Sequence, residues 1–297
     1  MNDYTPTPSP KGRPSPRAIK YLYALFAATA LCIITGVACS LLSLDEQTRY
    51  FSSEYASIAV LAAAALCIVL SLAAFPCISK HEVSTAGISQ SKARYLIALE
   101  LFTMLACIRL VWDTVGAKIT AAAQSGAKNS SLTVISLALL LIAFALSFLY
   151  SCRFAYKNPS TVFVAVIGIC RIVFFLYIIT TLYFDMIVEL NSPFKLIVQF
   201  TAAAGALQTC AEVRGTVSGI SERAYVAAKA LSMGFGALCF TLICGAAVKE
   251  IPLPDSSYIT YSAFFIASSV FSAYEIIRIA KKPLPVTQDL EERNDEI

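Results

Sequence analysis

Charged residues are scarce in this chain. They make up 14% of its 297 residues, whereas 58% are hydrophobic, and the mean hydropathy is +0.70. Soluble globular domains contain about 25% charged and about 45–50% apolar residues. The scarcity of charge therefore excludes a soluble globular protein and indicates a membrane protein.

Histidine is almost absent, and so are the short motifs of common catalytic sites. The only histidine is His81, which falls in a predicted loop. This excludes HExxH zinc hydrolases, intramembrane Ser-His pairs and haem sites built on paired histidines. The chain also lacks the GxxxxGK[ST] loop that binds nucleotide phosphates. We expect no metal and no cofactor, and the sequence leans away from an enzyme.

Long apolar runs are what the chain has in abundance. Eight of them reach the ~20 residues of helix that cross a ~30 Å hydrocarbon core. Lone strands cannot satisfy their backbone hydrogen bonds in lipid, so these runs predict helices. The expected fold class is all-α, a polytopic membrane bundle of eight transmembrane helices at residues 19–42, 55–77, 94–115, 132–154, 161–184, 194–212, 225–248 and 258–280.

The placement of Lys and Arg predicts the orientation of the bundle. With the N-terminus inside, 16 of the 23 Lys and Arg residues fall in inner segments or at the inner ends of spans, and five fall in outer segments or at the outer ends. The other two, Arg109 and Arg171, lie in the hydrophobic cores of spans. Such a bias favours the cytoplasm for the basic side, so both termini are expected to be cytoplasmic. We expect an integral protein of the cell membrane. The cations are spread along a membrane edge, which argues against a nucleic-acid partner.

Polar sequence is confined to two tails and to short loops. Residues 1–18 contain five prolines and predict a disordered cytoplasmic tail, and residues 284–297 form an acidic cytoplasmic tail. The bundle itself takes up residues 19–283.

The chain contains a faint internal repeat, since the basic-aromatic stretches at residues 20–25 and 94–99 are similar. Two explanations of the repeat are open: a bundle built from two four-helix halves, or a flanking sequence that recurs at every inner boundary.

The third predicted span is unusual because it contains Glu100, Arg109 and Asp113. An ionisable group within a membrane costs at least ~2.5–3.5 kcal/mol, which makes it a candidate for function. Arg109 and Asp113 are four residues apart, on one helix face, and can neutralise each other near the outer surface. Glu100 faces the opposite way and needs another partner.

Arg171, near the middle of the fifth span, is the best candidate for that partner. A pair between Glu100 and Arg171 would remove two unpaired intramembrane charges at once. Two interpretations of the pair are open: a static strut between two helices, and a protonatable site on a polar pathway. Glu100, Arg171, Arg109 and Asp113 together form the candidate intramembrane polar site.

Basic side chains also gather at the predicted inner boundary. They form a candidate rim for anionic lipid headgroups, with topology retention as the alternative, and comprise Arg153, Lys157, Arg278, Lys281 and Lys282. Glu212, Glu222 and Glu275 are assigned to the same boundary.

Small and amide side chains predict close helix contacts. Small residues recur four apart, which favours tight packing of helices, in the pairs Gly36 and Ser40, Ala230 and Gly234, and Ser232 and Gly236. In the sixth span, Gln199 and Gln208 are expected to donate hydrogen bonds between helices.

These features favour a transporter or permease-like protein for a small solute or ion. The competing interpretation is a non-catalytic membrane subunit, scaffold or regulator of a larger complex. Its expected partners are the lipid bilayer and either a membrane protein or further copies of the chain.

Overall fold

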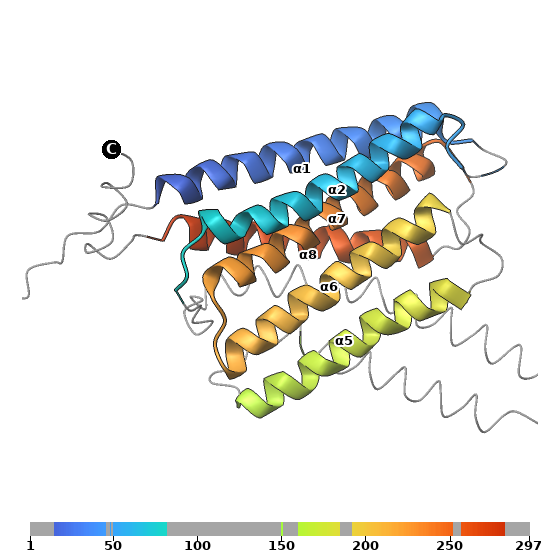
Figure 1. Cartoon of the computed structure of the whole chain (residues 1–297). Coiled ribbons are helices and arrows are strands. Elements are labelled where there is room, and N and C mark those ends of the chain that lie inside the picture. The colour runs from blue at the N-terminus through green and yellow to red at the C-terminus, as the bar shows by residue number, and fades with distance from the viewer. Residues whose placement is uncertain are drawn as a thin grey trace, which may run out of the picture.

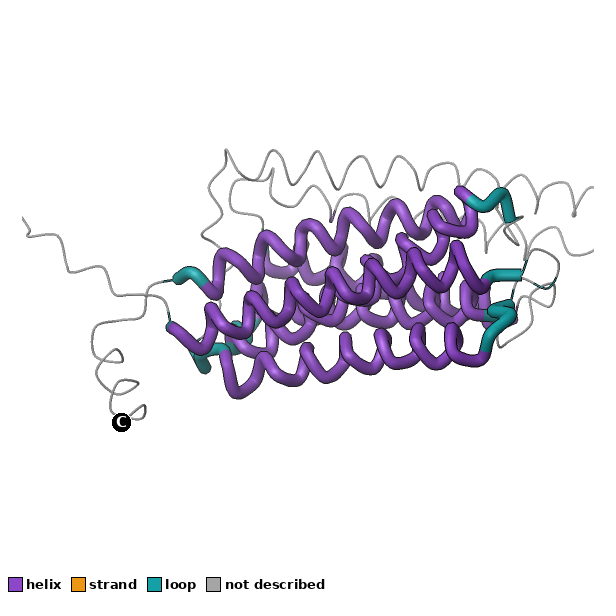
Figure 2. Tube along the Cα trace, turned by 90° about the horizontal axis from the view of Figure 1, so that it is seen from above, coloured by secondary structure: helices purple, strands orange, loops and turns teal. Residues whose placement is uncertain are grey.

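The structure is a computed structural model that describes residues 15–45, 48, 50–81, 150, 160–184, 192–251 and 257–282. These residues form six long helices, α1 (Pro16–Ser43), α2 (Glu54–Cys77), α5 (Thr161–Phe184), α6 (Pro193–Val217), α7 (Glu222–Val248) and α8 (Ser257–Ala280). Each is long and apolar enough to cross a membrane. Figures 1 and 2 show the six helices side by side in one bundle.

The six helices agree with the predicted all-helical, multi-pass class and correspond to six of the eight expected spans. The spans expected at 94–115 and 132–154 lie outside the described residues, except for Tyr150. The total of eight therefore stays a prediction, as do the two tails and the division into two four-helix halves.

Helices α6 and α7 are longer, where they face each other across the turn, than the apolar runs that predict them. α6 continues to Val217 and α7 begins at Glu222, about one turn beyond the predicted limits. A short turn at residues 218–221 joins them, with Gly219 at φ 78°, a backbone conformation that favours glycine. Charged residues close to this turn are therefore part of regular helix.

Helix α7 lies at the centre of the bundle. It contacts α1, α2, α6 and α8, and its buried residues run along nearly its whole length. By contrast, α1 and α2 turn many large apolar side chains outward, including Leu42 and Tyr55. An outward apolar surface is what a helix presents to lipid.

Small residues allow α7 to lie this close to its neighbours. A Cβ atom added to Gly236 would lie 2.7 Å from the carbonyl oxygen of Phe265 in α8, and one added to Gly234 would lie 2.6 Å from Cys67 Sγ in α2. Gly36 of α1 likewise faces Thr241 of α7. These contacts confirm the packing role predicted from the small-residue spacing.

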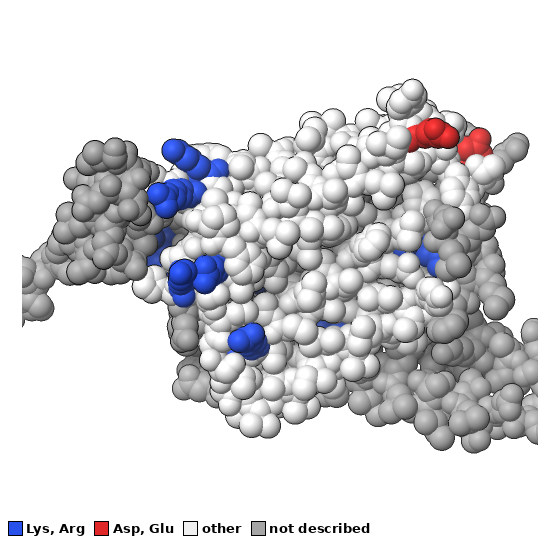
Figure 3. Space-filling model, viewed as in Figure 1, with Lys and Arg blue, Asp and Glu red and all other residues white. Residues whose placement is uncertain are grey.

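The two ends of the bundle differ in charge, as Figure 3 shows. We call one of them the basic end; it is where α1 and α7 begin and α2, α6 and α8 end. Its cationic residues include Arg17, Lys20, Lys80, Arg214, Arg223, Arg278, Lys281 and Lys282. Asp45 and Glu54 lie at the opposite end, which carries the acidic atoms visible in Figure 3.

Candidate functional site: a buried polar network

An ion pair is buried where α6 turns back into α7. Glu212 lies five residues before the end of α6, and Lys229 lies seven residues after the start of α7. Because the two helices run in opposite directions from one short turn, the side chains meet about 8–10 Å inside the helix ends. Lys229 Nζ donates to Glu212 Oε1. Lys229 is 0% and Glu212 is 5% exposed.

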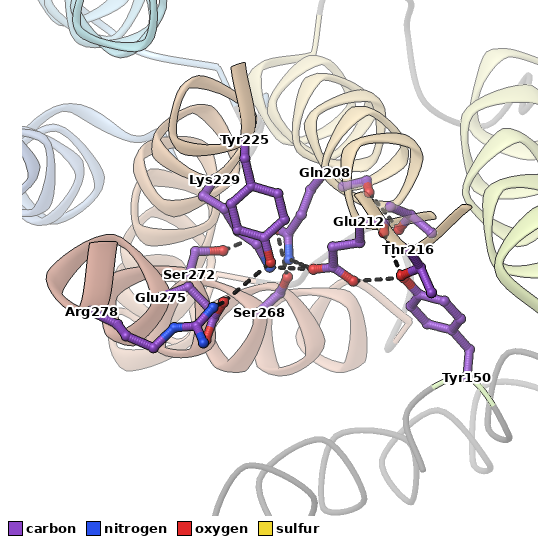
Figure 4. Close-up of polar contacts among 12 residues, drawn as sticks. Tyr150, Gln208, Glu212, Thr216, Tyr225, Lys229, Ser268, Ser272, Glu275 and Arg278 are labelled. Carbon is purple, nitrogen blue, oxygen red and sulfur yellow. Dashed lines mark hydrogen bonds and ion pairs between the residues drawn. The ribbon is translucent and has the colours of Figure 1, made fainter. Parts of the chain in front are cut away.

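Two further donors complete the shell of Glu212. The Gln208 amide, one turn earlier on α6, donates to Glu212 Oε1 over 3.0 Å, and the Tyr150 hydroxyl donates to Oε2 over 2.7 Å. Figure 4 shows these side chains converging on the carboxylate. Both oxygens of Glu212 are therefore occupied, which is the arrangement an ionised carboxylate requires when it is buried.

Helix α8 contributes hydroxyl groups to the same network. Ser272 and Ser268 donate to Gln208 Oε1 over 3.0 and 3.3 Å. The two serines are four residues apart and so lie on one face of α8. Gln208 thereby links the carboxylate of α6 to the polar face of α8.

A second carboxylate, Glu275, lies one turn closer to the basic end on α8. It is 1% exposed. Glu275 Oε2 accepts hydrogen bonds from the Tyr225 hydroxyl over 3.2 Å and from Arg278 Nη2 over 2.9 Å. Tyr225 lies in the first turn of α7, so this carboxylate also connects two helices (Figure 4).

Aromatic rings surround the cations of the network. Lys229 Nζ lies 4.1 Å from the centre of the Phe271 ring and 5.3 Å from that of Tyr225. Rings at these distances attract a cation through their negative faces. Lys229 is thus held by one carboxylate and two rings, all within the core.

Arg171 of α5 is the one predicted site residue of the intramembrane set that the structure describes. It is buried, and its guanidinium carbon lies 5.3 Å from the ring centres of Tyr150 and Phe264 and 5.9 Å from that of Phe175. Tyr150 therefore contacts Arg171 through its ring and Glu212 through its hydroxyl. The predicted partner, Glu100, lies outside the described residues together with Arg109 and Asp113.

The candidate lipid rim divides into three cases. Arg278 is paired with Glu275, and Lys282 donates to Glu222 over 2.7 Å. Lys281 is exposed at the basic end. Arg153 and Lys157 lie outside the described residues.

The two predicted amide donors also differ from one another. Gln199 Nε2 donates to the Ile179 carbonyl of α5 over 3.2 Å, which confirms an interhelical donor. Gln208 instead donates within its own helix and uses its oxygen as the acceptor between helices.

The central residues of the network, Glu212, Lys229 and Glu275, are not among the site residues predicted from the sequence. The sequence analysis counts all three with the charges of the inner boundary, whereas the structure buries them inside the bundle. One signal could have found the first two. They lie six residues before and eight residues after the turn at residues 218–221, so two antiparallel helices joined by this turn place them next to each other.

The network offers buried carboxylates, a buried ammonium group and hydroxyl groups within a membrane-type core. Such a set can bind a cation or a polar solute, or exchange protons. Among the described residues there is no group of three or more His, Cys, Asp or Glu side chains suited to a metal ion.

Comparison of the chain with protein families, with characterised proteins and with solved structures gives no match.

Proposed function

We propose that the protein is a transporter or permease-like membrane protein for a small solute or ion, with the Glu212–Lys229 network as its binding site. The observation that carries this proposal is the full burial of an ion pair inside helices long and apolar enough to span a membrane. Charged side chains in such helices usually mark an ion or substrate pathway or a proton relay.

A line of polar side chains along α8 supports the proposal. Glu275, Ser272 and Ser268 follow one another at spacings of three and four residues and face partners on α6 and α7. This line extends for about 10 Å along the helix from Glu275 inward. Most other side chains in the core are apolar. The line therefore forms a continuous row of polar groups from the basic end to the ion pair.

The second candidate function is that of a non-catalytic subunit in which the ion pair is a structural link. The observation that favours it is the complete shell of Glu212, whose two oxygens already accept three hydrogen bonds. The two functions can be separated by a variant that loses the charge but keeps the fold: it would lose transport if the pair is a binding site, and would change nothing but stability if the pair is a strut.

Reconstitution into proteoliposomes tests the transporter proposal. Charge movement would be recorded on solid-supported membranes while inorganic ions, amino acids and organic amines are applied in turn. We expect a substrate-dependent current in the wild type, its loss in Glu212→Gln, and its retention in Glu222→Gln, which changes the carboxylate paired with Lys282 outside the network. A current that survives Glu212→Gln unchanged, or none with any solute, would contradict the proposal.

The basic end is proposed to lie on the cytoplasmic side of the cell membrane. Its excess of Lys and Arg is the physical reason, because basic loops are retained on that side. Charges at this end that are still exposed, such as Lys281, would then lie near anionic headgroups.

A further inference from the structure

We propose that Glu275 is the proton-binding group of this site, so that the coupling ion is H⁺. The role of Glu275 in coupling depends on the proposed transport function, whereas its capacity to carry a proton does not. The different hydrogen bonding of the two buried carboxyl groups carries this proposal.

The hydrogen bonds of Glu275 are all on one oxygen. Tyr225 and Arg278 both donate to Oε2, while Oε1 is buried and has no hydrogen-bond partner among the described residues. An ionised carboxylate has two equivalent acceptor oxygens, and burying one of them without a donor is costly. A neutral carboxylic acid costs less to bury than a carboxylate. In that form both donors bond the carbonyl oxygen, Oε2, and Oε1 carries the proton.

Glu212 provides the internal comparison. Its Oε1 accepts from Lys229 and Gln208, and its Oε2 accepts from Tyr150. With donors on both oxygens and an ammonium group in contact, this carboxylate is stabilised as the anion. The two carboxyl groups of one network therefore differ in their hydrogen bonding, and this difference is why we assign the proton to Glu275 and not to Glu212.

The pairing of Arg278 with Glu275 is also incomplete, because it uses one atom of each side chain. Only Nη2 bonds the carboxyl group, and Arg278 Nε is buried without a hydrogen-bond partner in the described part of the chain. A guanidinium that held an anionic partner in full would use two parallel bonds, one to each oxygen. The single contact leaves room for Glu275 to be neutral while Arg278 stays in place.

The charged and titratable groups linked to Glu275 come from α6, α7 and α8 itself. Helix α7 supplies Tyr225 and Lys229, α6 supplies Glu212 through Gln208, and α8 itself supplies Arg278. On α1, Tyr21 donates to the Leu70 carbonyl of α2, and Arg17 and Lys20 are exposed.

The exposure of these side chains shows how close Glu275 lies to the surface of the basic end. The Arg278 side chain is 27% exposed and Glu275 is 1% exposed, so the pair connects the surface of the basic end with the core. Tyr225 contacts both Glu275, through its hydroxyl, and Lys229, through its ring.

Infrared spectroscopy of the reconstituted full chain tests the proton-binding role. The protonated form has a carbonyl stretch that the carboxylate lacks and that shifts in D₂O. We expect a pH-dependent carboxylic-acid band in the wild type that is missing in Glu275→Gln and unchanged in Glu212→Gln. A band that Glu275→Gln leaves intact, or its absence at every pH at which the protein is folded, would overturn the inference.

A second measurement uses the wild type alone and so does not depend on the folding of a variant. Dicyclohexylcarbodiimide enters membranes and adds to protonated carboxyl groups to give a stable N-acylurea. We expect mass spectrometry to find the adduct on Glu275 and not on Glu212, with less adduct at alkaline pH. Labelling of Glu212 in preference to Glu275 would contradict the assignment.

The two proposals fail in different ways. If Glu275 carries a proton but the vesicles show no flux, the transport function falls and the proton site stands. If a flux is present but is independent of a pH gradient and Glu275 stays ionised, the inference falls and the transport function stands.

Discussion

At the scale of single residues, the Glu212–Lys229 pair determines which substitutions the core can tolerate at these two positions. Each partner compensates the desolvation of the other, since Lys229 is fully buried and Glu212 nearly so. Removing one partner leaves an uncompensated charge in the core, whereas removing both leaves only neutral groups. The single and double substitutions should therefore differ sharply.

We expect Lys229→Met to lower the free energy of unfolding by about 3–5 kcal/mol, the range for breaking a buried pair. The double variant Glu212→Gln, Lys229→Met should lose less than half as much. Reversible unfolding in mixed detergent, followed by circular dichroism, measures both. If the loss in the double variant equals the sum of the losses in Glu212→Gln and Lys229→Met, the two side chains are not coupled.

Tyr150 is predicted to contribute through its hydroxyl as well as its ring. Tyr150→Phe keeps the ring beside Arg171 but removes the donor to Glu212 Oε2. A hydrogen bond to a charged group contributes about 1.5–3 kcal/mol, so a loss of that size is expected in the same unfolding assay. Tyr23→Phe, on the exposed face of α1, serves as the control and should change nothing.

At the scale of elements, the helices and their packing are more predictable than the site. Apolar runs locate α1, α2, α5, α6, α7 and α8 because crossing lipid demands long helices of apolar residues. They miss the ends of α6 and α7 because polar residues such as Arg214 and Arg223 do not stop a helix. Since Glu212 and Lys229 lie near those ends, the same effect assigns them to the boundary.

The close contacts of α7 lead to a prediction about glycine. Gly236→Ala would force a Cβ atom against the Phe265 carbonyl and Ser269 of α8, and overpacking of this kind costs about 1–3 kcal/mol. The melting temperature in detergent should fall accordingly. The control Ala27→Leu enlarges an exposed position on α1; if it lowers the melting temperature as much as Gly236→Ala does, close packing of α7 is not the cause.

At the scale of the whole molecule, the direction of the helices fixes where the flanking segments emerge. α1 begins and α8 ends at the basic end, so the chain before Pro16 and after Ala280 leaves the bundle on the same side. The positive-inside bias predicts that this side faces the cytoplasm.

Epitope tags inserted at each terminus test this arrangement. We expect both tags to be inaccessible to antibody on intact cells and accessible after the membrane is permeabilised. One accessible and one hidden tag would contradict the even number of crossings, and two accessible tags would contradict the orientation.

The buried network is proposed to hold the helices together and also to take part in transport. Flux through the double variant Glu212→Gln, Lys229→Met tests this most directly, because the variant removes both charges while leaving neither partner unpaired. We predict a folded, monodisperse protein whose substrate-dependent current in proteoliposomes is lost, alongside a wild-type current in the Glu222→Gln, Lys282→Gln control. A double variant that still carries the wild-type current would show that the buried pair is a strut and that the pathway lies elsewhere.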